Sequence, residues 1–261
     1  MCVSKIDDFG YWAGKNFAYS NEFLTPTIRV GINYAIAKNA ELAKLINGLD
    51  RLTNAGLVET IKRQIEKIAD AQYGKHGRKE DTKDDAYLTV FDLIQGWGGQ
   101  TGRNPYVQPK GNVARDQWGG WLAHYKDGAT KALDGKREDA LKSLKSIPQV
   151  GESFATKHLY FWGRGGEHHF PIYDTRMRTL LFFDEPQGAS YDRFLQKLAE
   201  LAAGQENLDT ITVEKALFAF SSNYFPNGTL VLRNNYKDKV DESVAKALAA
   251  AYANPTQQAC E

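Results

Sequence analysis

Apolar residues recur three and four positions apart over most of this chain, which is the spacing of an amphipathic α-helix. Residues 1–30 are rich in aromatic side chains but lack this spacing, so we expect an irregular segment packed onto the rest of the protein. One short run, 229–233, has the alternation of a strand. The remaining pattern predicts a mainly α protein, with helices over residues 36–46, 58–71, 84–95, 114–133, 136–145, 152 onward, 176–183, 191–203, 213–221 and 240–253.

Two polar interruptions divide this pattern. Residues 74–82 form a polar run without apolar positions, typical of an exposed loop, and residues 184–188 contain a proline and a glycine. We therefore predict a central helical lobe at 83–186, flanked by an N-terminal segment at 1–82 and a C-terminal helical lobe at 187–261. The N-terminal segment is expected to pack with the C-terminal lobe.

The most informative stretch joins the predicted helix at 136–145 to the one that begins at Glu152. Its connection is the short run Ile147-Pro148-Gln149-Val150-Gly151. Pro148 lacks a backbone N–H and has a fixed φ, and Gly151 leaves room where a side chain would collide. Such a turn leaves the N–H groups at the start of the second helix free to attract phosphate. The alternative is an ordinary connection between two helices.

The run Pro171-Ile172-Tyr173-Asp174-Thr175 follows this turn. The turn, the aspartate and the spacing between them resemble the helix-hairpin-helix superfamily of DNA glycosylases, whose hairpin reads Leu-Pro-Gly-Val-Gly. Within it, the chain is most similar to bacterial proteins with the 8-oxoguanine glycosylase fold, a group that includes phage-defence glycosylases. The resemblance is specific over residues 136–181, with the helix-hairpin-helix at 136–162. It implies two helical lobes with an active-site cleft between them.

Two positions depart from the family pattern. Gln149 stands where the family has the middle glycine of the hairpin, so the backbone must accept a Cβ there. Ser153 stands where bifunctional members carry a nucleophilic lysine, as it does in monofunctional adenine glycosylases. Lys157 follows one helical turn later on the same face. Its amine is either a nucleophile that attacks the sugar C1′ or a solvated or phosphate-contacting charge.

Asp174 is the first candidate for a catalytic residue. Cleavage of an N-glycosidic bond builds positive charge on the sugar, and a carboxylate beside the sugar stabilises that charge. The same residue can also cap the helix that follows it, a role that Asp often has. The two roles are compatible.

The resemblance also implies contacts with DNA. The glycine-rich run at 96–104 matches the loop that fills the gap left by a flipped base, and it is equally suited to ending the preceding helix. The backbone carbonyls of Lys145, Ile147 and Val150 match positions that hold a monovalent cation in relatives, and no other cofactor is expected. The predicted DNA-contacting residues are Lys145, Gln149, Val150, Gly151, Ser153 and Arg176, together with Trp97, Gln100 and Asn104 of the glycine-rich run.

Composition narrows this picture only slightly. The 261 residues include 33 Lys and Arg against 32 Asp and Glu, a net charge of +1, so phosphate binding has to rely on a local basic patch around the hairpin. Two cysteines, Cys2 and Cys260, are too few for an iron–sulfur cluster or a disulfide framework. The sequence lacks an apolar membrane-spanning run and a signal peptide. We expect a cytoplasmic monomer that contacts no membrane.

Together these features predict a DNA glycosylase that flips a modified base out of duplex DNA and hydrolyses its N-glycosidic bond, leaving an abasic site. The divergent hairpin favours a specialised substrate, such as glucosylated hydroxymethylcytosine in phage DNA. Two alternatives stay open. One is an 8-oxoguanine glycosylase with lyase activity in base-excision repair, and the other is a DNA-binding module without catalysis.

Overall fold

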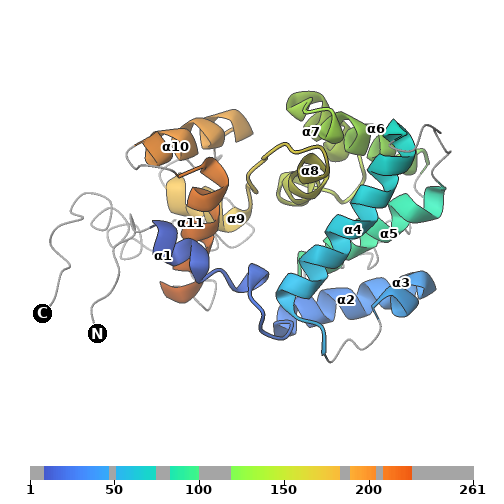
Figure 1. The fold of residues 1–261 in the computed structure, drawn as a ribbon. Coiled ribbons are helices and arrows are strands. Elements are labelled where there is room, and N and C mark those ends of the chain that lie inside the picture. Colours follow the sequence, from blue (N-terminus) through green and yellow to red (C-terminus); the bar gives the residue numbers. More distant parts are fainter. Residues whose placement is uncertain are drawn as a thin grey trace, which may run out of the picture. The chain divides into compact units, whose positions relative to one another are not determined.

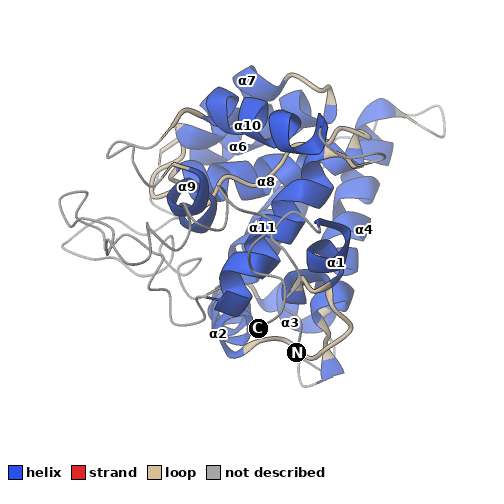
Figure 2. Ribbon diagram, turned by 90° about the vertical axis from the view of Figure 1, so that its left-hand side faces the viewer, coloured by secondary structure: helices blue, strands red, loops and turns tan. Residues whose placement is uncertain are grey.

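The computed structural model describes residues 9–46, 51–74, 83–99, 119–182, 189–203 and 208–224. In these ranges the regular secondary structure is helical, and no strand is drawn (Figure 1 and Figure 2). The extended pairing there is limited to one isolated antiparallel bridge between Phe23 and Thr53. The fold is therefore mainly α, as the hydrophobic spacing predicts. The predicted strand at 229–233 and the predicted helix at 240–253 lie outside the described residues.

The contacts within the chain define two compact units. The central unit is Ala18–Ile172, and the terminal unit combines Met1–Phe17 with Tyr173–Glu261. These units divide the chain after residues 17 and 172, whereas the sequence predicts three segments that divide after residues 82 and 186. The helices of the central unit are α2 (Pro26–Lys38), α3 (Ala40–Leu45), α4 (Asn54–Tyr73), α5 (Asp84–Trp97), α6 (Trp121–Leu133), α7 (Arg137–Lys145) and α8 (Glu152–Gly165). Those of the terminal unit are α1 (Phe9–Gly14), α9 (Thr175–Leu181), α10 (Tyr191–Ala203) and α11 (Thr210–Tyr224).

The core of the central unit forms around α4, α5 and α8. Helix α4 buries one stripe at the spacing of successive turns, formed by Leu57, Ile61, Ile65 and Ile68. Helices α5 and α8 are enclosed more completely, with every residue buried at 90–97 and 155–163. Helices α6 and α7 pack against each other and against α8. Helix α8 is therefore held from several sides, which makes it a rigid support for the hairpin at its start.

The beginning of the chain is more helical than the sequence pattern predicts. The expectation of an irregular segment at 1–30 is wrong for its described part, because α1 lies at 9–14 and α2 starts at Pro26. The Thr25 hydroxyl accepts a hydrogen bond from the Ile28 N–H, and Pro26 occupies the first turn of α2. A capping Thr followed by Pro is a helix-start signal that the sequence already contains.

The predicted helix at 36–46 is divided at Asn39. The Asn39 backbone N–H donates to the Ala35 carbonyl and ends α2, while its side-chain oxygen accepts from the Glu41 N–H and begins α3. Its side-chain amide also donates to buried Asp92 of α5 at 3.0 Å. Helix α6 begins at Trp121 rather than 114, after a turn at residues 119–120, and residues 114–118 lie outside the described part.

The terminal unit brings the two ends of the described chain together. Helix α1 packs on α11, where the Trp12 ring meets Phe220 edge to face at 5.4 Å. The Asn16 side-chain amide donates to the Lys215 carbonyl at 3.1 Å. Tyr173, fully buried, stacks on Phe194 of α10 at 4.6 Å. This aromatic packing fixes the backbone immediately before Asp174.

Candidate functional site

The hairpin between α7 and α8 has a buried base and an exposed tip. Ile147 and Val150 are 2% and 3% exposed, and the Val150 N–H donates to the Ile147 carbonyl at 3.1 Å. Between them Gln149 has a φ of 63°, in the left-handed region, so the chain does accept a Cβ where the family has glycine. Gly151 is exposed and precedes α8 without a side-chain cap. No atom lies within 4 Å of the position of a Cβ at Gly151, so a ligand can approach the helix start.

Two opposite charges meet across the hairpin. The Lys145 ammonium lies 3.2 Å from the Glu152 carboxylate, which stands in the first turn of α8. Acidic groups are favourable at a helix N-terminus because they offset its partial positive charge. The predicted phosphate contact of Lys145 therefore competes with an ion pair that is already formed.

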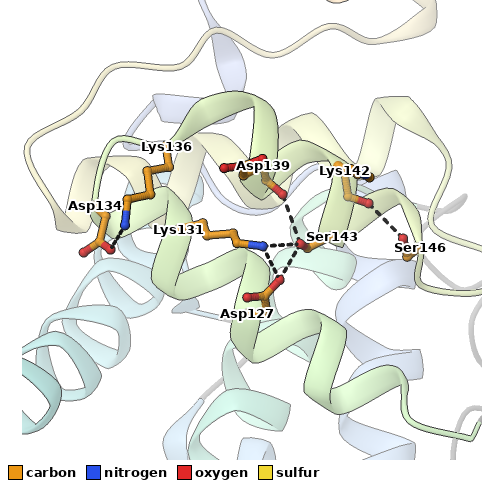
Figure 3. Close-up of polar contacts among 8 residues, drawn as sticks. All are labelled: Asp127, Lys131, Asp134, Lys136, Asp139, Lys142, Ser143 and Ser146. Atoms are coloured by element: carbon orange, nitrogen blue, oxygen red, sulfur yellow. Dashed lines mark hydrogen bonds and ion pairs between the residues drawn. The ribbon is translucent and has the colours of Figure 1, made fainter.

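A polar cluster joins α7 to α6 and so positions the hairpin (Figure 3). The buried Ser143 hydroxyl donates to the Asp127 carboxylate, and the Lys131 ammonium lies 2.7 Å from the same carboxylate. These hydrogen bonds, that from Lys131 first and that from Ser143 second, lower the pKa of Asp127. The cluster links the last two turns of α7 to α6.

Lys157 reaches back to Ser153. Its ammonium donates to the Ser153 hydroxyl at 3.0 Å and to the Ser153 carbonyl at 3.4 Å, and it lies 4.9 Å from the centre of the Phe154 ring. The direction follows from helix geometry, because side chains point towards the N-terminus and cover the preceding turn. The residue is only 9% exposed, and its amine lies beside Ser153, the residue that the sequence resemblance aligns with the lysine of bifunctional relatives.

The glycine-rich run meets the ring of Phe154, the residue after Ser153. Gly98 lies directly against the Phe154 ring, since a Cβ at Gly98 would come within 2.3 Å of it. Trp97 is buried and meets the Phe161 ring of α8 edge to face at 5.0 Å, a position that favours packing over contact with DNA. Gln100 and Asn104 lie outside the described residues. The structure thus brings the start of the run, but not its predicted wedge residues, to the Ser153–Lys157 turn.

A line of buried polar groups joins α8 to α5 and α6, and none of its four residues is among the predicted site residues. The Trp162 indole N–H donates to the Tyr125 hydroxyl at 2.9 Å, the hydroxyl lies 3.1 Å from His158 Nδ1, and His158 Nε2 lies 3.0 Å from the Gln95 amide. Complete burial, and secondarily the charge of Lys157, lowers the pKa of His158 to about 3, so the imidazole is neutral. This line ties α5 and α6 to α8 and fixes the rotation of α8. In the sequence, Gln95 and His158 are visible only as polar residues within largely apolar stretches.

Asp174 begins α9 in the terminal unit. One carboxylate oxygen accepts a hydrogen bond from the Met177 N–H at 3.0 Å, so the residue is the N-cap of α9. The side chain is half-buried, and among the described residues only this N–H donates to the carboxylate. Arg176 is directed to α11, where its guanidinium donates to the Ser221 hydroxyl at 3.4 Å and lies 5.8 Å from the Phe218 ring. Capping orients Asp174 and leaves its second oxygen available.

Metal binding, base stacking and membrane insertion find less support in the described part of the chain. No group of three His, Cys, Asp or Glu side chains is arranged to hold a metal ion there, and the cation predicted at the hairpin carbonyls stays a prediction. Trp121, Tyr160, Trp162 and Phe220, aromatic residues that could stack on a base, are all buried. Of the helices in the described ranges, none has both the length and the apolar character needed to cross a bilayer.

Comparison with known proteins identifies a family. A family model described as "Putative 8-oxoguanine DNA glycosylase OGG-like protein" matches residues 39–218. Neither the curated proteins nor the solved structures gave a significant match. The matched range contains the hairpin, the Ser153–Lys157 turn, the glycine-rich run and Asp174.

Proposed function

Because the chain belongs to the OGG-like family of putative 8-oxoguanine DNA glycosylases, we propose that it turns a modified base out of duplex DNA and hydrolyses the N-glycosidic bond. DNA is the substrate that this family implies. The observation that carries the proposal is Asp174, a carboxylate held by one N–H at a helix start, with its second oxygen available. Such a group can stabilise the positive charge that develops on the sugar as the base departs.

The hairpin supplies the DNA contact in this proposal. No atom lies within 4 Å of the position of a Cβ at Gly151, so a phosphate can approach the start of α8. The buried side chains of Ile147 and Val150 anchor the turn in the core. The basic residues in the last turn of α7, Lys142 and Lys145, lie where the helix leads into the hairpin. Binding at this point is independent of base sequence, as contacts with phosphate generally are.

Hydrolysis is the chemical mode that the surroundings of Lys157 favour. Its ammonium is held by two oxygens of Ser153 and lies against the face of the Phe154 ring. These contacts hold the side chain along α8, so in this mode water, not the amine, attacks the sugar.

A lyase mode is the second candidate, and one distance favours it. The Lys157 amine lies 3.0 Å from the hydroxyl of Ser153, the residue that replaces the family's nucleophilic lysine. If Lys157 loses its proton when the substrate arrives, it can attack C1′, displace the base and form a Schiff base. The strand is then cleaved by β-elimination.

The substrate we propose is a base changed by oxidation or by a bulky modification. The family description names 8-oxoguanine, and the divergent hairpin led us to glucosylated hydroxymethylcytosine in phage DNA. The first substrate implies a role in repair and the second a role in antiviral defence. We further propose that the protein acts as a cytoplasmic monomer.

The deciding experiment is a panel of duplexes, each with one modified base and each matched to an unmodified duplex. Base release is measured as strand cleavage after alkali, and cleavage without alkali reports lyase activity. Release from one modified duplex and none from its unmodified partner is expected. Specific binding without base release from any duplex would instead support a DNA-binding module that has no catalysis.

A further inference from the structure

The ring of Phe154 contacts both the glycine-rich run and the candidate lysine. Phe154 stands in the first turn of α8, and the Lys157 ammonium, three residues later, lies 4.9 Å from the centre of its ring. The edge of the ring lies against Gly98, where a Cβ would come within 2.3 Å of one ring carbon and 2.8 Å of another. Gly98 therefore leaves the space that the ring occupies.

The other aromatic residues of this helix have a different role. Tyr160, Phe161 and Trp162 are buried, and their rings pack on further aromatic rings. Phe154 is half-buried, and among the described residues no aromatic ring packs on it. What distinguishes Phe154 is the ammonium over its ring, so its position bears on the lysine more than on the aromatic core.

Three contacts define where the Lys157 amine lies. It donates to the Ser153 hydroxyl at 3.0 Å and to the Ser153 carbonyl at 3.4 Å, and the face of the Phe154 ring attracts the positive charge. A lysine side chain is long and flexible, so its amine takes many positions unless such contacts restrict it. To attack a sugar, the amine has to leave all three.

We propose that Phe154 is a positioning residue, whose ring, seated against Gly98, holds the Lys157 amine beside Ser153 and so keeps the enzyme hydrolytic. The inference rests on the proposed function and names a residue that sets its chemical mode. Loss of the ring then releases the amine and uncovers a lyase activity that the wild type restrains.

The uncovered reaction can be followed on DNA that has already lost a base. The free amine adds to the C1′ aldehyde of an abasic site and loses water, which forms a Schiff base. Loss of the C2′ proton to solvent then breaks the bond from C3′ to its oxygen and expels the phosphate. Borohydride stops this sequence, because it transfers a hydride to the C=N bond and leaves a stable amine that joins protein to DNA.

Phe154→Leu tests the proposal, with Phe161→Leu as the matched control. Phe161 lies on the same helix and meets the Trp97 ring at the end of α5. Each variant is incubated at saturating concentration with borohydride and a duplex that contains one abasic site. We expect Phe154→Leu to trap adduct about fivefold or more above the wild-type background, the value of one cation–π contact. Phe161→Leu should trap as little as the wild type.

A second variant displaces the ring without removing it. Gly98 has a φ of −64°, which alanine adopts readily, so Gly98→Ala places a Cβ against the Phe154 ring and should also increase trapping. Both increases should vanish when Lys157→Gln is added. A folded Phe154→Leu or Gly98→Ala that traps no more than the wild type, or an increase that survives Lys157→Gln, would overturn the inference. Absence of base release from every modified duplex would instead defeat the proposed function and leave the comparison on the abasic duplex standing.

Discussion

At the scale of single residues, Asp174 and Asp209 form a matched pair. Each begins a helix of the terminal unit by accepting a hydrogen bond from the N–H three residues later, at 3.0 Å and 2.6 Å. Asparagine caps helices as well as aspartate, so both Asp→Asn variants should fold. We expect Asp174→Asn to slow single-turnover base release by about 100-fold or more, because a neutral amide cannot offset the charge on the sugar. Asp209→Asn should keep the wild-type rate. Similar rates in the two variants would remove Asp174 from the mechanism.

The mode of cleavage is decided at Lys157. We expect borohydride to trap no protein–DNA adduct, and strands to break only after alkali, because two hydrogen bonds to Ser153 hold the Lys157 side chain along α8. The same trapping is then repeated with the variants Lys157→Gln and Lys145→Gln. An adduct that is lost in Lys157→Gln but kept in Lys145→Gln would establish the lyase mode. An adduct that survives in Lys157→Gln would point to another amine, with Lys145 the next to test.

At the scale of helices, the Ser143 cluster predicts how firmly α7 is attached to α6. Ser143→Ala removes the hydroxyl that donates to Asp127 and should lower the free energy of unfolding by about 1 kcal/mol. Ser146→Ala is the control on the same helix, because the Ser146 hydroxyl is exposed and donates to the Lys142 carbonyl only one turn back. Urea unfolding at neutral pH measures both. A loss no larger than that of Ser146→Ala would show that the cluster does not stabilise the fold.

The same cluster predicts that the free energy of unfolding falls at acidic pH. Its partners lower the pKa of Asp127 in the folded protein, so the folded state binds this proton less readily than the unfolded state. The contribution is therefore present above the unfolded pKa, about 4, and is lost as the pH falls through the lower folded pKa. Between pH 5 and pH 3 the wild type should lose more stability than Asp127→Asn, by a small amount because the carboxylate is half exposed.

The spacing of apolar residues predicted most helices within a few residues of their bounds. It could not predict contacts between residues that are far apart in the sequence. The predicted helix at 191–203 coincides with α10, and that at 84–95 falls two residues short of α5. The break at Asn39 was missed because the apolar spacing continues across it. The hydrogen-bonded line from Gln95 to Trp162 could not be predicted. Its partners are 33 to 63 residues apart in the sequence, and they meet only because three helices pack together. Motif order predicted the hairpin and singled out Asp174, and helix periodicity placed Lys157 and Ser153 on one face of the helix without predicting their hydrogen bond.

At the scale of the whole molecule, a net charge of +1 gives almost no general attraction to DNA, so affinity should depend on a few local charges. Lys142 is exposed on the last turns of α7, while Lys44 is an exposed lysine of α3 that pairs with Glu41. Lys142→Gln should reduce the slope of log affinity against log salt by about one, the value of a single phosphate contact. Lys44→Gln should leave the slope unchanged. Equal slopes in all three proteins would place the basic contacts elsewhere.

The pairing of α1 with α11 has a consequence for the order in which the protein is made. The central unit is continuous in sequence, so all its helices have been synthesised once residue 172 has left the ribosome. Helix α1 is translated much earlier, yet Trp12 and Asn16 find Phe220 and Lys215 only about two hundred residues later. The first helix therefore waits through the synthesis of nearly the whole chain with its aromatic face uncovered.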